Sequence, residues 1–358
     1  MKRNTIIFTI IYLLIFLVGG YFLYTLYLKP YFTPEPVTPK TSEQIDLYFS
    51  DGGKLNYVNT NEQQGSRKTT ALKLASVGNI ASFSLSRDKQ YFFYEEVLTP
   101  QKSVIWKYNQ TDNTSEKIFS ALTPGLENFT SFKLPVLSPD NTKLAFVGQN
   151  PSGEYLYYYD FTDKSLTNLN ASTPKTGVRQ LAWSTNNASL YDTSFSTNKT
   201  VISSTNSQKV SEQVWEGTGE TTELKATKDT LVFGLKNGQA INIFSLVPLT
   251  KKITQITDLT FPRTLGVFNI APDQKSIVFE IKDASTSQSD IYYESLDGTN
   301  LIQITDDGKS SYPVISSDNG SILYFLKGSG LYKSNTNKTR KEKVLNYDGN
   351  INRIFTWR

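Results

Sequence analysis

The stretch LPVLSPDNTKLAFVG (134–148) decides the fold of this chain. Two short apolar runs flank SPDNT, whose residues favour tight turns, so the stretch predicts two antiparallel β-strands. The same pattern recurs at SFSLSRDKQYFFYEE (82–96), QLAWSTNNASLYDTS (180–194), ELKATKDTLVFGL (223–235), VFNIAPDQKSIVFEI (267–281) and PVISSDNGSILYFLK (313–327). The chain is therefore built from a repeated pair of strands.

The repeat has the length of a propeller blade. The small residue before each turn serves as a marker, and the six markers are Ser86, Ser138, Ser184, Thr227, Ala271 and Ser316. Successive markers are 43 to 52 residues apart, near the ~40–45 residues of a four-stranded blade. Each unit has room for two further strands, such as EYLYYYD (154–160) and SLTNLN (165–170) in the third unit. No segment with a helical period follows residue 44, so the pattern predicts an all-β propeller.

The two ends of the repeat region predict how the ring closes. IDLYFSDGGKLNYVNT (45–60) aligns with ILYFLKGSGLYKSNTN (322–337), which holds the second and third strands of the last unit. The first unit therefore lacks its innermost strand. INRIFTW (351–357) resembles the first strand VRQLAWS (178–184), including its tryptophan. We expect a seven-bladed β-propeller over residues 45–358, in which the C-terminal strand closes the first blade and pairs its open edge.

The marker pattern resembles the W-S-P-D-G repeat of TolB-like, WD40-like (PD40) β-propellers, which also occurs in the propeller domains of prolyl-oligopeptidase-type peptidases. The copies that resemble it most are LSPDNTKLAFVG (137–148) and LIQITDDGKSSYPVISSDNGSILYF (301–325). The resemblance implies a propeller fold and an accessory binding role. The aspartate of the repeat stands at Asp88, Asp140, Asp273 and Asp318. We interpret it as a turn residue whose side chain binds the nearby backbone, in preference to a metal ligand.

The composition excludes several classes of enzyme. The chain has no histidine and no cysteine, so it has no Ser-His-Asp triad, no cysteine nucleophile, no disulfide and no Cys or His metal site. It also contains no G-x-S-x-G elbow and no P-loop. Two pairs of adjacent carboxylates, Glu95-Glu96 and Asp306-Asp307, are interpreted as structural, because neighbours on a strand face opposite ways and the second pair lies in a turn. We expect no catalytic residue, no cofactor and no metal.

An N-terminal apolar run predicts a membrane anchor. Thr5 to Leu28 reads TIIFTIIYLLIFLVGGYFLYTLYL, 24 residues without a charge. As a helix it would extend roughly 36 Å, enough to cross a hydrocarbon core of about 30 Å. The alternative, a cleaved signal peptide, has a shorter apolar region followed by a small-residue cleavage site. Lys2 and Arg3 precede the run, which places the N-terminus in the cytoplasm by the positive-inside rule.

The chain is accordingly divided into four segments. We expect a cytoplasmic N-terminus (1–4), a transmembrane signal anchor (5–28), a Pro-rich linker (29–44) and an extracytoplasmic propeller (45–358). The localisation predicted is the cell membrane, crossed once. The whole chain carries +4 at neutral pH and residues 1–40 account for +3 of it, so the propeller is nearly neutral. Such a surface argues against nucleic acid as a partner.

Aromatic residues are abundant, with 21 tyrosines and 21 phenylalanines. Rings favour pleated surfaces, and blades that face one another need bulky apolar side chains between them. We therefore interpret most of these rings as packing, and the alternative is a surface on which carbohydrate stacks.

One position per blade is a candidate binding site. It lies four residues before the Trp or Leu position of each innermost strand, and its occupants are Arg353, Ala81, Lys133, Arg179, Thr222, Gly266 and Ser311. Three are basic, none is acidic, and the innermost strands of a propeller line its central channel. Lys133, Arg179 and Arg353 therefore predict a channel mouth that favours anions, such as an acidic peptide tail. The alternative is that the three cations are solvated or packed along their aliphatic stems.

The function expected from these features is non-catalytic binding. A membrane-tethered propeller without His or Cys fits recognition of an envelope protein or a cell-wall component. The alternative is an extracellular hydrolase that acts on glycans or lactones, with its site in the propeller channel. A third possibility is a sensory or stalk role within a larger membrane complex. The oligomeric state stays open.

Overall fold

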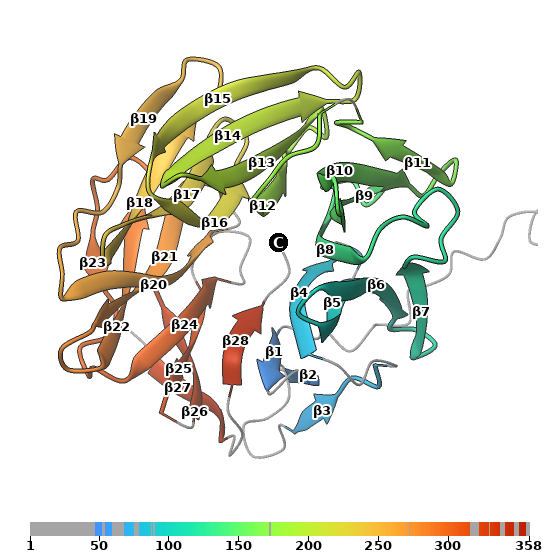
Figure 1. Ribbon diagram of the computed structural model, residues 1–358. Coiled ribbons are helices and arrows are strands. Elements are labelled where there is room, and N and C mark those ends of the chain that lie inside the picture. The colour runs from blue at the N-terminus through green and yellow to red at the C-terminus, as the bar shows by residue number, and fades with distance from the viewer. Residues whose placement is uncertain are drawn as a thin grey trace, which may run out of the picture. The chain divides into compact units, whose positions relative to one another are not determined.

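The protein is described by a computed structural model that covers residues 47–51, 54–58, 68–74, 79–86, 88, 90–171, 173–271, 273–315, 322–328, 330–336, 341–346 and 351–355. All of these residues belong to one compact unit, Ile45–Arg358. The regular elements within them are 28 β-strands, arranged as seven four-stranded sheets. Figure 1 shows the sheets as blades arranged around a common centre, with the first strand of each blade innermost. The predicted all-β, seven-bladed propeller is therefore confirmed.

The first four blades each run from an innermost strand to an outer edge. Blade 1 contains β28 (Ile351–Phe355), β1 (Leu47–Asp51), β2 (Lys54–Val58) and β3 (Thr69–Ala71). Blade 2 contains β4 (Asn79–Leu85), β5 (Tyr91–Thr99), β6 (Lys102–Asn109) and β7 (Thr114–Phe119). Blade 3 contains β8 (Ser131–Leu137), β9 (Lys143–Asn150), β10 (Gly153–Asp160) and β11 (Ser165–Asn168). Blade 4 contains β12 (Val178–Trp183), β13 (Ser189–Ser196), β14 (Lys199–Asn206) and β15 (Ser211–Thr218).

The remaining three blades repeat this order. Blade 5 contains β16 (Glu220–Ala226), β17 (Leu231–Asn237), β18 (Ala240–Val247) and β19 (Lys252–Gln255). Blade 6 contains β20 (Arg263–Ile270), β21 (Ser276–Asp283), β22 (Gln288–Ser295) and β23 (Ile302–Gln303). Blade 7 contains β24 (Ser310–Ile315), β25 (Ile322–Lys327), β26 (Gly330–Asn335) and β27 (Lys341–Asn346).

The ring closes through a strand from the far end of the chain. β28 pairs antiparallel with β1, with Tyr48 opposite Phe355 and Phe49 opposite Ile354. One C-terminal and three N-terminal strands thus form blade 1, as the alignment of the two ends predicted. Trp357, which the alignment matched to Trp183, lies outside the described residues.

The predicted anchor cannot be followed in the structure. Residues 1–46, and with them the segments 1–4, 5–28 and 29–44, lie outside the described residues. Among the residues that are described, no helix is long and apolar enough to cross a membrane.

The core lies between the blades. Each hydrophobic cluster joins neighbouring sheets, as where Phe119 of blade 2 stacks on Phe146 of blade 3 with ring centroids 4.3 Å apart. The largest fully buried side chains in the described part of the chain are four tyrosines and eight phenylalanines. Packing between blades is therefore the main use of the aromatic residues, as predicted.

The turn of the repeat is held by its own side chains. Ser138 Oγ donates to Asp140 Oδ1 at 2.6 Å, and the same carboxylate oxygen accepts the N–H of Thr142 at 3.0 Å. Ser138 Oγ in turn accepts the N–H of Lys143 at 2.8 Å. Ser86 and Asp88 repeat these contacts in blade 2. The repeat aspartate is therefore a turn residue in these blades, and Asp318 of blade 7 lies outside the described residues.

Candidate functional site

Each innermost strand carries one more residue than its partner near the end at which it begins. The register shifts by one at Ala81, at Leu134-Pro135, at Arg179, at Thr222, at Gly266-Val267, at Tyr312-Pro313 and, on β28, at Asn352. These are β-bulges, which bend a strand and re-aim its side chains. The seven sequence-predicted positions all lie in a bulge or directly beside one. The predicted positions therefore coincide with the bulges of the innermost strands, and binding at them stays a prediction.

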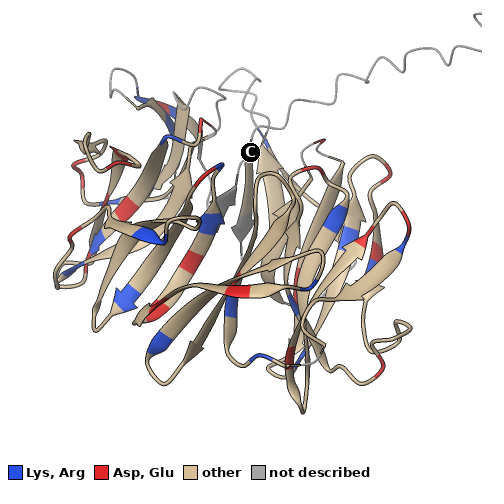
Figure 2. Ribbon diagram, turned by 90° about the horizontal axis from the view of Figure 1, so that it is seen from above, with Lys and Arg blue, Asp and Glu red and all other residues tan. Residues whose placement is uncertain are grey.

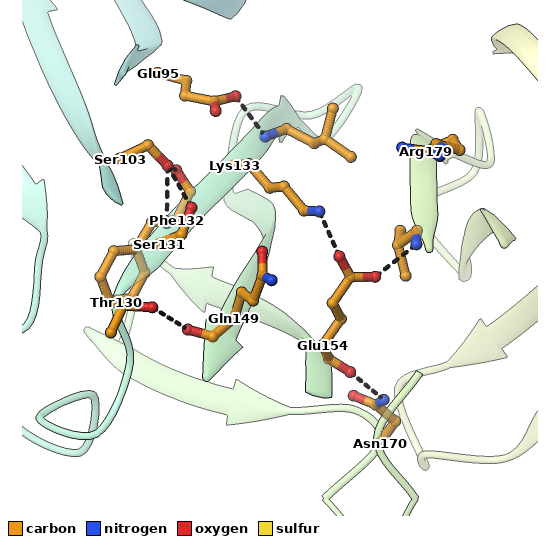
Figure 3. Close-up of polar contacts among 12 residues, drawn as sticks. Glu95, Ser103, Thr130, Ser131, Phe132, Lys133, Gln149, Glu154, Asn170 and Arg179 are labelled. Carbon is orange, nitrogen blue, oxygen red and sulfur yellow. Dashed lines mark hydrogen bonds and ion pairs between the residues drawn. The ribbon is translucent and has the colours of Figure 1, made fainter. Parts of the chain in front are cut away.

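Lys133 is engaged by a carboxylate of its own blade. It precedes the bulge of β8, and its Nζ makes an ion pair with Glu154 Oε1 on β10 (Figure 3). The other oxygen of Glu154 accepts the N–H of Val178, at the start of β12, at 2.6 Å. Glu154 is almost fully buried and therefore ties blade 3 to blade 4. Much of the charge of Lys133 is neutralised by this contact.

Arg179 is more available than Lys133. It is the bulged residue of β12, and its Nε lies 3.4 Å from Glu220 Oε1, at the start of β16. The side chains of Arg179 and Glu220 are 48% and 38% exposed. An ion pair this exposed to solvent contributes little to stability. Within the described part of the chain the two terminal nitrogens of Arg179 have no hydrogen-bond partner. A planar guanidinium with two free donors can bind a carboxylate or a phosphate.

Arg353 is placed only by its backbone. It lies on β28, opposite Ser50 of β1, and its side chain lies outside what the structure describes. The three predicted residues thus occupy the same end of the innermost strands of blades 1, 3 and 4. Lys133 and Arg179 are on neighbouring blades (Figure 3).

Two buried carboxylates near the bulges were missed as a pair by the sequence analysis. Glu95 Oε2 on β5 accepts the N–H of Leu134 at 3.1 Å and the hydroxyl of Ser82 at 2.7 Å. Leu134 has a φ of 57°, an unusual conformation for a branched residue. Glu280 on β21 occupies the matching position in blade 6, opposite a bulge. Each glutamate precedes a blade whose bulge contains a residue with positive φ followed by proline, Leu134-Pro135 or Tyr312-Pro313.

Burial raises the pKa of both of these carboxyl groups. For Glu95 the rise is opposed by the hydrogen bonds from Ser82 and Leu134 and by the charge of Lys133. For Glu280 it is opposed by Lys282 and by the backbone N–H groups of Tyr312 and Val267. The sequence contains a signal for this pair. Each glutamate stands nine residues after the marker of its repeat, and the innermost strand of the next blade contains the dipeptide Pro-Val.

The adjacent carboxylates behave as the sequence analysis expected. Glu95 contacts blade 3, whereas Glu96 Oε2 accepts the indole N–H of Trp106 at 2.7 Å within blade 2. Asp307 accepts hydrogen bonds from Lys309 and Ser310 in its turn.

A second buried ion pair lies beside the first. Both carboxylate oxygens of Asp192 on β13 accept hydrogen bonds of 2.7 Å from Lys175 Nζ. Asp192 is fully buried, which raises its pKa, while the ammonium of Lys175 opposes the rise. The backbone of Lys175 also pairs with Glu154. The two ion pairs, Lys133–Glu154 and Lys175–Asp192, therefore form a continuous polar seam between blades 3 and 4.

Further along the innermost strands, side chains tie neighbouring blades to one another. Ser84 accepts the N–H of Leu137, Trp183 donates to the carbonyl of Val136, Gln180 donates to the carbonyl of Thr222, and Asn269 donates to the carbonyl of Pro313, at 2.9 to 3.2 Å. The tryptophan of the repeat thus links two blades. These contacts fix the channel wall, so the bulged end presents its side chains from a rigid support.

Several acidic side chains near the bulges are engaged by contacts within the protein. Glu95, Glu154 and Asp192 each accept hydrogen bonds from amide or ammonium groups of the protein. In the described ranges no group of three or more acidic side chains is placed to hold a metal ion. Basic and acidic residues are interleaved along the strands in the side view of Figure 2. Of the two predicted residues whose side chains are described, Lys133 is paired with Glu154, whereas the exposed guanidinium of Arg179 keeps free donors.

Comparison with known proteins supports the fold. No family model and no curated protein matches the sequence. A TolB from Agrobacterium tumefaciens is 14% identical over 73% of this chain and 88% of that chain, with a TM-score of 0.52. A prolyl endopeptidase is 12% identical over 87% of this chain and 50% of that chain, with a TM-score of 0.61. An oligogalacturonate lyase from Vibrio parahaemolyticus is 11% identical over 85% of each chain, with a TM-score of 0.58.

These similarities concern architecture. The chain spans half the length of the prolyl endopeptidase and most of the TolB and lyase chains. At identities this low they show that the chain shares the propeller fold with TolB, and the same fold carries peptidase-linked and lyase functions elsewhere.

Proposed function

We propose that this chain is a non-catalytic binding propeller that recognises an envelope protein or a cell-wall component. In this proposal residues 5–28 hold it in the cell membrane, and the propeller lies outside the cytoplasm. The similarity in fold to TolB supports the binding role. The observation that carries the proposal is the state of the charges at the end where the innermost strands begin and carry their bulges, which we call the bulged mouth. Two of its buried carboxylates, Glu95 and Glu154, accept hydrogen bonds from the protein itself, whereas Arg179 keeps free donors.

The ligand proposed for this mouth is anionic, such as an acidic peptide tail. Arg179 would form the main contact, because Lys133 already shares its charge with Glu154. Arg353 lies on the innermost strand of blade 1, near the equivalent end, and would add a second cation. Bidentate binding of a carboxylate by arginine is stronger than a neutral hydrogen bond and fixes orientation.

Cross-linking in intact cells, followed by mass spectrometry, would capture the partner. Its affinity would then be compared for the unmodified chain, Arg179→Glu and Arg179→Glu/Arg353→Glu. We expect a loss of tenfold or more, about 1.4 kcal/mol, on charge reversal. The matched control is Lys199→Glu, because Lys199 is an exposed cation of the same blade, paired with Glu216. Equal affinity of the unmodified chain and both charge-reversed variants would contradict binding of the partner at the bulged mouth.

The alternative function is hydrolysis of glycans or lactones at the channel. The similarity in fold to an oligogalacturonate lyase favours testing it. The purified full chain would be incubated in detergent with a panel of oligosaccharides and lactones, with and without divalent metal ions. We expect no turnover above the blank. Sustained turnover that follows protein concentration would contradict the non-catalytic proposal.

A further inference from the structure

Three large apolar side chains protrude from consecutive blades. Val210, Leu249 and Leu301 are 61%, 93% and 58% exposed. Each lies in the turn between the third and fourth strands of its blade, in blades 4, 5 and 6. The turn of blade 5 contacts the start of β15 in blade 4, because Lys251 Nζ lies 3.0 Å from Glu212 Oε1 and donates to the carbonyl of Gln213. Single exposed leucines are common on protein surfaces, whereas a set on adjacent turns of one face indicates an interaction site.

The chain enters the propeller at this same face. Leu47, the first described residue, pairs with Val58, the last residue of β2. The connection from the third to the fourth strand of blade 1 starts after Val58. Leu47 therefore lies at the end of the blade that carries the third-to-fourth turns. The bulged mouth with Arg179 lies at the opposite end, where the innermost strands begin.

The residues that precede Leu47 limit how far this face can lie from a membrane. Eighteen residues, 29–46, separate the uncharged run 5–28 from the first described strand. Fully extended, they would reach about 60 Å, and a Pro-rich segment reaches slightly less. The face at which the chain enters is thus confined to the neighbourhood of the bilayer if residues 5–28 span it.

Lysines accompany two of the three apolar tips. Lys209 precedes Val210, and Lys251 and Lys252 follow Leu249 by two and three residues. Lys209, Lys251 and Lys252 are all exposed. An apolar side chain beside lysine is the combination that enters the boundary between headgroups and acyl chains, because the ammonium stays at the headgroups while the apolar group is buried.

We propose that the face formed by the third-to-fourth turns of blades 4–6 lies against the lipid bilayer, with Val210, Leu249 and Leu301 in the headgroup–acyl boundary. The inference rests on the proposed membrane anchoring. It directs the bulged mouth away from the membrane, toward a partner in the envelope. A second copy of this chain is the competing occupant of the apolar face, and the test separates the two.

The absence of cysteine from the sequence makes a single-site probe straightforward. Leu249→Cys would be labelled with an environment-sensitive fluorophore in the full chain, reconstituted into phosphatidylcholine vesicles with a minority of phosphatidylglycerol. The matched control is Leu122→Cys, because Leu122 is 92% exposed and lies between β7 and β8, on the opposite face. Quenching by nitroxide-labelled lipid would be compared with quenching by iodide in the water. We expect several-fold stronger lipid quenching at position 249 than at 122, and the reverse order for iodide.

Each other outcome overturns the inference in a distinguishable way. Equal lipid quenching at both positions, in a chain that floats with the vesicles, would leave the anchor intact and remove the docking face. Protection of position 249 from both quenchers would indicate cover by a second copy. A chain that does not float with the vesicles would remove the anchor, and the docking face with it. Leu301→Cys would report independently on the same face.

Discussion

Asp192 shows how a single buried charge depends on its partner. Its carboxylate is fully buried and accepts both of its 2.7 Å hydrogen bonds from Lys175, whose side chain is itself 17% exposed. Two ions in such a place stabilise a fold only slightly as a pair, but either one alone is costly. The polar seam between blades 3 and 4 is therefore sensitive to the loss of one partner.

Replacing Lys175 by methionine should destabilise the propeller by about 3–5 kcal/mol at neutral pH. The folded variant would hold Asp192 with a raised pKa, so it binds a proton more readily than the unfolded chain. Its unfolding free energy should therefore fall as pH rises from the usual aspartate range through the raised pKa, and the defect should be smallest in acid. Denaturant unfolding at several pH values measures this. Lys175→Met/Asp192→Leu should recover much of the loss, and a double variant as unstable as the single one would contradict the explanation.

Glu294 gives a second prediction with a defined pH window. It is 4% exposed, and burial, with a smaller contribution from Asp297, raises its pKa from near 4.5 to about 7. A carboxyl group of this kind weakens the fold as pH rises from about 4.5 through 7, where the folded protein must ionise it. Glu294→Gln should therefore be more stable than the unmodified chain above pH 7, by on the order of 1–2 kcal/mol. The two curves should converge near pH 4.5, and parallel curves would show that Glu294 titrates normally.

At the scale of elements, the turn of the repeat was predictable because its chemistry is local. Ser138, Asp140 and Thr142 are neighbours in sequence, and their hydrogen bonds need no other blade. The bulges were not predicted, since they depend on the register between two strands. The role of Glu95 could not be predicted for the same reason. Its carboxylate accepts a hydrogen bond from Leu134, which lies 39 residues later in the next blade.

Asp140→Ala should remove the side-chain bonds of its turn and lower stability by about 1 kcal/mol. Asp140→Asn should be nearly neutral, because Asn186 makes the same contacts to Ser184 and Ala188 in blade 4. Thermal unfolding of the two variants would be compared. An alanine variant as stable as the asparagine one would show that the turn does not need its side chain.

Glu95→Ala should lower the free energy of unfolding more than Asp140→Ala does. It leaves the N–H of Leu134 without its acceptor in a partly buried position, a penalty of about 1–3 kcal/mol. Glu95→Gln keeps an acceptor oxygen and should recover most of that loss. Hydrogen exchange at Leu134 would report the local effect, and unchanged protection in Glu95→Ala would show that the bulge is held by other contacts.

At the scale of the whole molecule, the number of blades and the way the ring closes followed from the sequence. The spacing of Ser86, Ser138 and the later markers gave six units, and the mismatch at residues 45–60 indicated the shared seventh. The surroundings of the predicted cations could be predicted only in part. Lys133 and Arg179 do lie at one end of neighbouring strands, but the carboxylates Glu154 and Glu220 that meet them come from other strands and blades. Ion pairing between strands, within one blade or across two, has no fixed sequence separation, so a repeat pattern does not reveal it.

The closed ring is the claim on which the faces, the mouth and the proposed partners depend. A disulfide between Ser50→Cys and Arg353→Cys tests it directly, because these residues are opposite one another on β1 and β28 and the chain has no other cysteine. Residues opposite in an antiparallel pair have Cα atoms about 4.5–5.5 Å apart, within the range of a disulfide. We predict efficient intramolecular oxidation of this pair in the native protein, and none for Ser50→Cys/Ser311→Cys, whose second site is the equivalent position of blade 7. Absence of the first disulfide, or equal formation of both, would contradict the closed seven-bladed ring.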